Sequence, residues 1–139
     1  MKDVEAYLGR LNRPIEAVDG VQGTFLIRSS NSMPPIALRV DPPLVILRVH
    51  IGDSPGADNA ALFRKLLQLN AKALVHSSYG LEDDRIVLGS ALELENLDFN
   101  ELEAALDEMD VALAQQVPGL AELSKQSGGS TSGASSSRK

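Results

Sequence analysis

The chain has 139 residues and a formal net charge of −6, from 13 Lys and Arg against 19 Asp and Glu, and this balance repels nucleic acid and anionic membranes. It has no cysteine, which excludes disulfides, thiolate metal sites and cysteine nucleophiles and fits a reducing compartment. Tryptophan is also absent and aromatic residues make up only 4%, so aliphatic side chains must build the core and base-stacking platforms are not expected.

No stretch of the sequence has the character of an export signal or a membrane span. Residues 1–10 lack the basic start and apolar run of a signal peptide. The longest apolar stretches, 36–40 and 44–49, are interrupted by arginines and fall far short of the roughly 20 residues that a membrane helix needs. We therefore expect a cytoplasmic protein that does not insert into membranes.

The first element is a short amphipathic helix. Val4, Leu8 and Leu11 recur at a spacing of three to four residues and therefore share one face. Pro14 follows closely and stops the helix. The chain thus begins with a helix that buries a single stripe.

Strand periodicity then replaces helical periodicity. Apolar side chains alternate over residues 23–28, and short apolar runs follow at 36–40 and 44–51. Pro42-Pro43 separates the last two runs, because neither proline can donate a ladder hydrogen bond. The short connections predict three antiparallel neighbours.

A second helix follows a loop at residues 52–56, and Ser54 or Asp58 is a suitable N-cap for it. Its apolar arc is wider than the roughly 100 degrees that a helix lying on one sheet needs, which predicts contact on a second side. We interpret this arc as a candidate surface for dimerisation or protein binding, formed by Leu62, Phe63, Leu66, Leu67 and Leu69.

The next two strands give the clearest hairpin signal in the sequence. A strand is predicted at residues 74–79, an acidic turn at 80–84, and a long, cleanly alternating strand from Ile86 to Leu94. The tight turn makes these two strands antiparallel partners.

A last main helix is predicted to begin after Asp98. Glu101 lies three residues further on, which is an acidic variant of the capping box, and an apolar stripe continues to Leu113. Pro118 breaks this helix or begins a short extra turn. Residues 1–123 are therefore expected to form a single domain, and the Ser/Gly-rich residues 124–139 a disordered tail.

The predicted order is helix, three strands, helix, two strands, helix (α-β-β-β-α-β-β-α). With mostly short links, all the helices can cover one face of an antiparallel sheet. The sequence therefore predicts an α+β fold, a two-layer sandwich with the helices on one face of the sheet.

The usual catalytic and ligand-binding patterns are absent from the sequence. His50 and His76 have no carboxylate at metal-ligand spacing, and His76 and Ser77, as adjacent strand residues, point to opposite faces. Residues 82–84 lack the oxygen-ligand pattern of a calcium loop, and no phosphate-binding glycine pattern occurs. We expect no catalytic residue, no metal and no cofactor.

The acidic residues of the last helix are interpreted as a solvated face: Glu101, Glu103, Asp107, Glu108 and Asp110.

Arg28, Arg39 and Arg48 fall one on each of the first three predicted strands and interrupt otherwise apolar runs. If the strand registers bring them together, they form a basic strip that needs carboxylates from this chain or from a partner. Such a strip is a candidate docking site for an acidic segment of a client, because arginine binds carboxylates bidentately. The alternative is three unrelated, solvent-facing arginines.

The order of elements in one long stretch is similar to that of a known family. From Leu62 to Leu106 the sequence reads LFRKLLQLNAKALVHSSYGLEDDRIVLGSALELENLDFNELEAAL, a Leu-rich helix, a Gly80-Leu81 hairpin, a long strand, an acidic turn and a helix. Over residues 1–123 the chain resembles the type III secretion chaperone-like fold, which includes the Tir-type chaperones and the YbjN-like proteins of bacteria. Pro42-Pro43 and the weakly patterned first helix depart from the secretion chaperones.

This resemblance implies a non-enzymatic homodimer whose exposed apolar grooves hold extended segments of a client protein, or a regulatory relative. The leading hypothesis is therefore a chaperone-like protein-binding module that is not an enzyme, with a protein client as its partner. The alternative is a regulatory domain that senses a small ligand, which an enclosed pocket between sheet and helices would favour.

Overall fold

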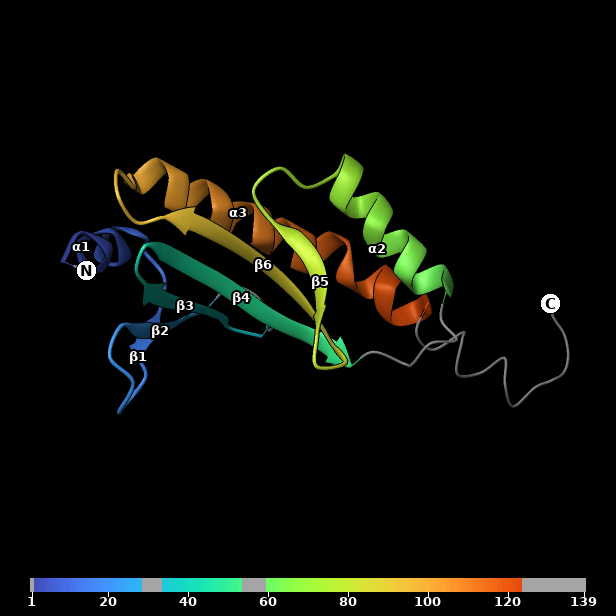
Figure 1. Ribbon diagram of the computed structural model, residues 1–139, viewed down its shortest axis with the longest axis horizontal. Helices are drawn as coiled ribbons and strands as arrows, with labels where there is room; N and C mark the ends of the chain where they lie inside the picture. The colour runs from blue at the N-terminus through green and yellow to red at the C-terminus, as the bar shows by residue number, and fades with distance from the viewer. Residues whose placement is uncertain (1, 29–33, 54–59, 124–139) are drawn as a thin grey trace, which may run out of the picture.

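The structure is a computed structural model, and it describes residues 2–28, 34–53 and 60–123 (Figure 1). Residues 117–123 form a further helical turn, as Pro118 predicts. The predicted order of elements is confirmed, and the structure adds one short strand, β1, before the first predicted strand. The elements are α1 (Lys2–Arg10), β1 (Ile15–Ala17), β2 (Thr24–Ile27), β3 (Ile36–Asp41), β4 (Leu44–Asp53), α2 (Ala60–Lys72), β5 (Ser78–Glu82), β6 (Arg85–Glu93) and α3 (Phe99–Gln115).

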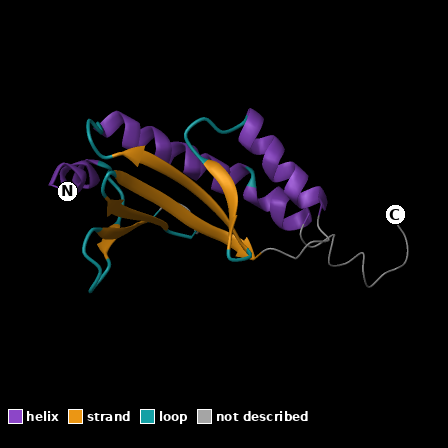
Figure 2. Cartoon of the chain, viewed as in Figure 1, coloured by secondary structure: helices purple, strands orange, loops and turns teal. Residues whose placement is uncertain are grey.

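Six strands form one antiparallel sheet in the order β1-β2-β3-β4-β6-β5. The helices lie along one side of this sheet (Figure 2). Alternation along β4 shows the two faces: Val45 and Leu47 are buried toward the helices, whereas Ile46 and Arg48 lie on the opposite face and are partly or largely exposed. The predicted α+β sandwich of two layers is therefore confirmed.

The core lies between the sheet and α3, the longest helix. This helix buries one continuous stripe at helical spacing, which fits the apolar periodicity of its sequence. Its fully or almost fully buried side chains are Leu102, Ala105, Leu106, Met109, Ala112 and Leu113.

Local sequence signals explain where α3 begins and where the β5–β6 hairpin turns. The Asp98 carboxylate accepts a hydrogen bond from the Glu101 backbone N–H at 2.7 Å, and the Glu101 side chain accepts one from Asp98 at 3.2 Å, so the predicted capping box is present. Asp83 and Asp84 have positive φ values of 50° and 65°, as a two-residue type I′ hairpin turn requires.

The strand predicted at residues 74–79 is wrong in position, because β5 begins at Ser78. The backbone N–H groups of Val75, His76 and Ser77 donate to the side chain of Glu108 on α3, so they are not available to a strand ladder. The proposed caps Ser54 and Asp58 and the predicted tail at 124–139 lie outside the described residues.

Within the described segments, no helix has the length and apolar character needed to cross a membrane.

Candidate functional site

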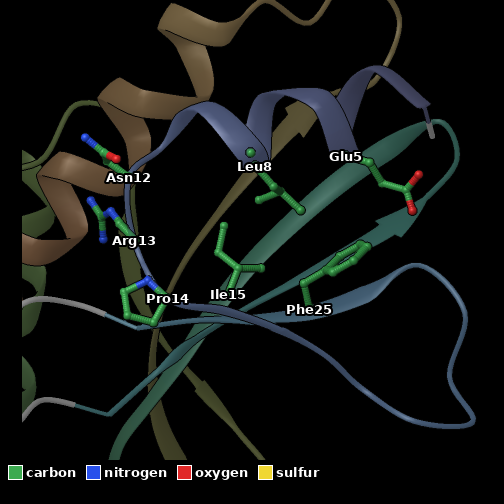
Figure 3. Close-up of a pocket in the computed structure, with 8 residues that line it drawn as sticks. Glu5, Leu8, Asn12, Arg13, Pro14, Ile15 and Phe25 are labelled. Atoms are coloured by element: carbon green, nitrogen blue, oxygen red, sulfur yellow. The ribbon is translucent and has the colours of Figure 1, made fainter.

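A groove of about 660 Å³ runs between α1 and the first two strands. Figure 3 shows the side chains of Leu8, Ile15 and Phe25 gathered beneath α1, with Glu5 toward one end and Asn12 and Arg13 toward the other. Gly9 also lines the groove, and a Cβ added there would meet no atom within 4 Å. The groove is therefore open to solvent beside α1, with an apolar floor and polar ends.

The floor of this groove borders an edge of the sheet, because among the described residues β1 pairs only with β2. Arg28 N–H donates to the Pro14 carbonyl and Val18 N–H to the Thr24 carbonyl, each at 3.0 Å. Antiparallel geometry then directs the N–H and C=O groups of the intervening residues Ile15 and Ala17 away from β2. These backbone groups form an unpaired edge directly beside the groove, the arrangement to which an extended peptide can add as a strand.

A second hollow of about 540 Å³ continues along the same edge. It is lined by the 17–25 hairpin and shares Glu5 and Phe25 with the first groove. Together the two hollows follow β1 along its length.

Polar contacts join α1 and the link after it to α3 and to Leu97, which lies just before α3. Arg13 is 14% exposed and its Nη2 lies 2.5 Å from Asp110 Oδ2 and 3.3 Å from Asp107 Oδ1. The Tyr7 hydroxyl donates to the Leu97 carbonyl at 3.0 Å, and the Arg10 guanidinium lies 4.0 Å from the centroid of the Phe99 ring. These contacts join α1 and the link after it to α3 and to the residue stretch just before α3.

The loop between α2 and β5 is fastened to α3 through Glu108. Its carboxylate accepts from the N–H groups of Val75, His76 and Ser77 at 2.8 to 2.9 Å and from Ser77 Oγ at 2.7 Å. Partial burial raises the pKa of Glu108, but these hydrogen bonds lower it more, so that the pKa lies below its ordinary value. The interpretation of this carboxylate as part of a merely solvated face is therefore wrong.

Beyond this loop, Tyr79 is buried, and its hydroxyl donates to Gln116 Oε1 at 2.6 Å. Burial raises the pKa of Tyr79 to about 12. The Asn70 side chain accepts a hydrogen bond from the Tyr79 backbone N–H at 2.7 Å and donates one to the Tyr79 carbonyl at 3.1 Å. The end of α2, the start of β5 and α3 are thus joined by side chains.

The leucine arc of α2 divides between the core and the surface. Leu62 and Leu66 are buried, and Phe63 and Leu69 pack against the core from half-buried positions. Leu67 is 69% exposed and is the member of the arc that faces outward. A role of the arc as an interface with another protein stays a prediction.

The three arginines of the predicted basic strip lie on the outer face of the sheet or next to it, and each is paired within its own chain. Arg28 lies 3.6 Å from Glu16 and Arg39 lies 3.4 Å from Asp41, whereas Arg48 bonds Glu82. The register places Arg48 opposite Ala37 and Arg39 opposite Ile46, so neighbouring strands do not put the arginines side by side. Docking of an acidic client here stays a prediction.

The histidines lie apart and show no catalytic geometry among the residues that the structure describes. His50 Nε2 lies 3.1 Å from the Gly52 carbonyl on β4, and His76 lies in the loop fastened by Glu108, with its backbone carbonyl accepting from Ser90 Oγ at 2.6 Å. The described segments contain no group of three or more histidine or carboxylate side chains placed to hold a metal ion.

The profile of the CesT_Tir_1 family, a family of type III secretion chaperones, matches residues 1–126. The chain belongs to this family. Among curated proteins none matches the sequence.

Solved structures agree with this assignment at the level of the fold. A chain of the heterodimeric ExoU–SpcU complex of the Pseudomonas aeruginosa type III secretion system superposes with a TM-score of 0.64 at 19% identity, covering 85% of this chain and 96% of that one. A chain of the HopA1–SchA chaperone–effector complex gives a TM-score of 0.59 at 16% identity, covering 87% of this chain and 91% of that one. YbjN from E. coli, titled a putative transcription regulator, superposes with a TM-score of 0.57 at 11% identity, covering 81% of this chain and 87% of YbjN. The resemblance identified from the sequence is therefore confirmed.

The α1 groove has no clear signature in the sequence. Its lining comes from α1, the link after it and two strands, and β1 has only three residues, too few for a clear alternating pattern. One signal was available: Gly9 interrupts an amphipathic helix at a place where a large side chain would enter the groove.

Proposed function

We propose that this protein is a cytoplasmic, non-enzymatic chaperone that acts as a homodimer and holds an extended segment of a client protein. The client segment adds as a strand to the free edge of β1, and its alternate side chains enter the α1 groove. The observation that carries the proposal is the unpaired backbone of Ile15 and Ala17 beside an apolar groove.

Several features support this mode of binding. Main-chain hydrogen bonds to β1 are independent of the client's sequence, whereas the floor formed by Leu8, Ile15 and Phe25 selects apolar side chains. Membership of a chaperone family and the fold shared with chaperone–effector complexes favour a protein client. The alternative, a small-ligand sensor, calls for an enclosed pocket, and the α1 groove is open along the sheet edge.

Two substitutions at Gly9 test the groove as a matched pair. Gly9→Trp places a large ring in the open space beside α1, whereas Gly9→Ala leaves the groove open and should stabilise the helix by roughly 0.5–1 kcal/mol. Peptides selected on the wild-type protein from a displayed random library serve as probes, and their affinity is measured by fluorescence anisotropy. We expect Gly9→Trp to weaken binding about tenfold or more and Gly9→Ala to leave it unchanged.

Hydrogen exchange identifies the binding mode in the same samples. Bound peptide should protect the amides of Ile15 and Ala17, which face the free edge, while the amide of Val18, already bonded to Thr24, changes little. Selected peptides that bind Gly9→Trp as tightly as wild type and leave both edge amides unprotected would refute strand addition at β1.

A further inference from the structure

The two ends of the α1 groove differ in charge. At one end, Arg13 Nη2 lies 2.5 Å from Asp110 Oδ2 and 3.3 Å from Asp107 Oδ1, so this cation is already neutralised. Figure 3 shows Glu5 toward the opposite end of the groove. Glu5 is exposed and has no ion-pair partner among the side chains that the structure describes. The Arg13 end thus carries charges of both signs, and the Glu5 end a negative charge alone.

The second hollow continues this negative end along the edge of the sheet. Glu5 and residues 17–25 line it, and Asp19 is the charged residue that the hairpin contributes. Asp19 is exposed, and like Glu5 it has no ion-pair partner in the described part of the chain. The described lining of this hollow contains no Lys or Arg. Its field therefore attracts a cation and repels a carboxylate.

The register of β1 determines which side chains of an added strand enter the groove. Ile15 lies opposite the buried Ile27 and Ala17 opposite Phe25, so both face the helix side of the sheet. In a strand that pairs with β1, the side chains opposite Ile15 and Ala17 lie on the same side. The next side chain on that side lies two residues further along, about 7 Å beyond Ala17. This position falls at the second hollow, whose lining begins at Ala17.

The backbone of β1 favours antiparallel addition. Ile15 and Ala17 each direct both their N–H and their C=O group to the edge, and in an antiparallel ladder such a residue exchanges both bonds with the residue opposite. Because β1 runs from Arg13 toward the second hollow, an antiparallel client strand runs from the hollow toward Arg13. The client residue at the hollow therefore precedes the two residues that face Ile15 and Ala17.

We propose that the client segment carries a lysine or arginine two positions before a pair of alternating apolar residues, in the order cation, any residue, apolar, any residue, apolar. The inference rests on the proposed function, because it assigns the sequence and direction of the strand that adds to β1. The cation faces Glu5 and Asp19, and the apolar side chains contact the floor of the groove. Main-chain hydrogen bonds and apolar contacts are insensitive to charge, so these two carboxylates supply the selectivity.

Selection of peptides tests this sequence preference directly. A displayed library of random peptides is selected at low salt, in parallel on the wild-type protein and on its variants, and the bound peptides are sequenced. On wild type we expect Lys and Arg to be enriched about threefold or more at the position two before the apolar pair. Replacing that cation by glutamine in the tightest peptide should weaken binding about threefold to tenfold, measured by fluorescence anisotropy. The difference should shrink at about 1 M salt, where the Debye length is only about 3 Å.

Two double variants connect the preference to the second hollow. Glu5→Gln with Asp19→Asn removes both carboxylates, and we expect it to select peptides without the enrichment of Lys and Arg. Asp83→Asn with Asp84→Asn makes the same change in net charge at the β5–β6 turn, on the opposite edge of the sheet, and should select the same peptides as wild type. Asparagine accepts the positive φ values of these two positions, and circular dichroism should show both variants folded.

Three results would overturn the inference and leave strand addition in place, provided that bound peptide still protects the amides of Ile15 and Ala17. They are peptides without a preferred cation, a cation preferred after the apolar pair instead of before it, and a preference that persists in Glu5→Gln with Asp19→Asn. Selected peptides that leave both amides unprotected would overturn the proposed strand addition, and this inference with it.

Discussion

The carboxylate of Glu108 accepts four hydrogen bonds, three from consecutive backbone N–H groups and one from Ser77 Oγ. Three N–H groups converging on one anion make a small carboxylate-binding nest, built here from the chain's own loop. The loop that leads into β5 thus takes its conformation from a residue 31 to 33 positions further along the chain. At the scale of the residue, this contact decides where β5 begins.

Removal of this carboxylate should destabilise the fold. Glu108→Ala leaves the loop amides to water, and because the site is partly exposed we expect the free energy of unfolding to fall by only about 1–2 kcal/mol. Urea unfolding measures the loss, and hydrogen exchange should show the amides of residues 75–77 losing protection. Glu103→Gln changes a charge on the same helix without touching the loop, so loop amides that lose protection equally in this variant would contradict the assignment.

The same contact predicts a dependence of stability on pH. Since the pKa of Glu108 is lower in the folded state than its ordinary value of 4.5, its contribution is complete above that value and is lost as the pH falls through the folded-state pKa. Glu108→Gln removes the titrating group, so the difference in stability between wild type and this variant should narrow as the pH falls below 4.5. A difference that stays constant from neutral pH to well below that value would contradict the prediction.

Among the secondary-structure elements, α3 makes contacts on two of its sides. Its buried stripe covers the sheet, while its polar side binds Arg13 at the groove and the loop before β5. The helix therefore holds both the link after α1 and the loop before β5 in place. Its N-terminus is set by the capping box of Asp98 and Glu101.

The cap gives a prediction for this element. Asp98→Ala removes the acceptor for the Glu101 N–H and should lower the free energy of unfolding by about 1 kcal/mol, whereas Asp98→Ser retains a capping oxygen and should cost less. Thermal unfolding followed by circular dichroism compares the two variants. Equal losses for Ala and Ser would show that the cap contributes nothing specific.

At the scale of the whole molecule, the sheet has one face covered by helices and one face that the described residues leave without a layer. Neighbouring residues on β4 therefore differ in environment: Leu47 is fully buried, and Ile46 lies on the outer face and is only partly buried. The edge strand β1 and the groove of α1 occupy one end of the sheet, and α2 with β5 the other.

This arrangement predicts unequal costs for two similar substitutions. Leu47→Ala leaves a cavity in the core and should lower the free energy of unfolding by about 2–5 kcal/mol. Ile46 is only partly buried, so Ile46→Ala removes less apolar surface from the fold and should lower the free energy of unfolding by about 1–2 kcal/mol. Equilibrium denaturation measures both, and an equal or inverted order would contradict the two-layer arrangement.

Features that rest on local chemistry could be predicted from the amino-acid sequence. The clean alternation from Ile86 to Leu94 predicted β6, and Asp98 with Glu101 predicted the start of α3, because alternation and capping involve residues a few positions apart. The order of elements and the resemblance to the chaperone family followed from the same patterns.

Features that join residues distant in the sequence could not be predicted in this way, because they depend on how the chain folds. The groove brings Gly9, Ile15 and Phe25 together, and the start of β5 depends on Glu108, whose partners are more than 30 positions away. The separate ion pairs of Arg28, Arg39 and Arg48 likewise depend on strand register. A carboxylate has the same local signature on a solvated face and in a loop contact, and only the path of the chain distinguishes the two.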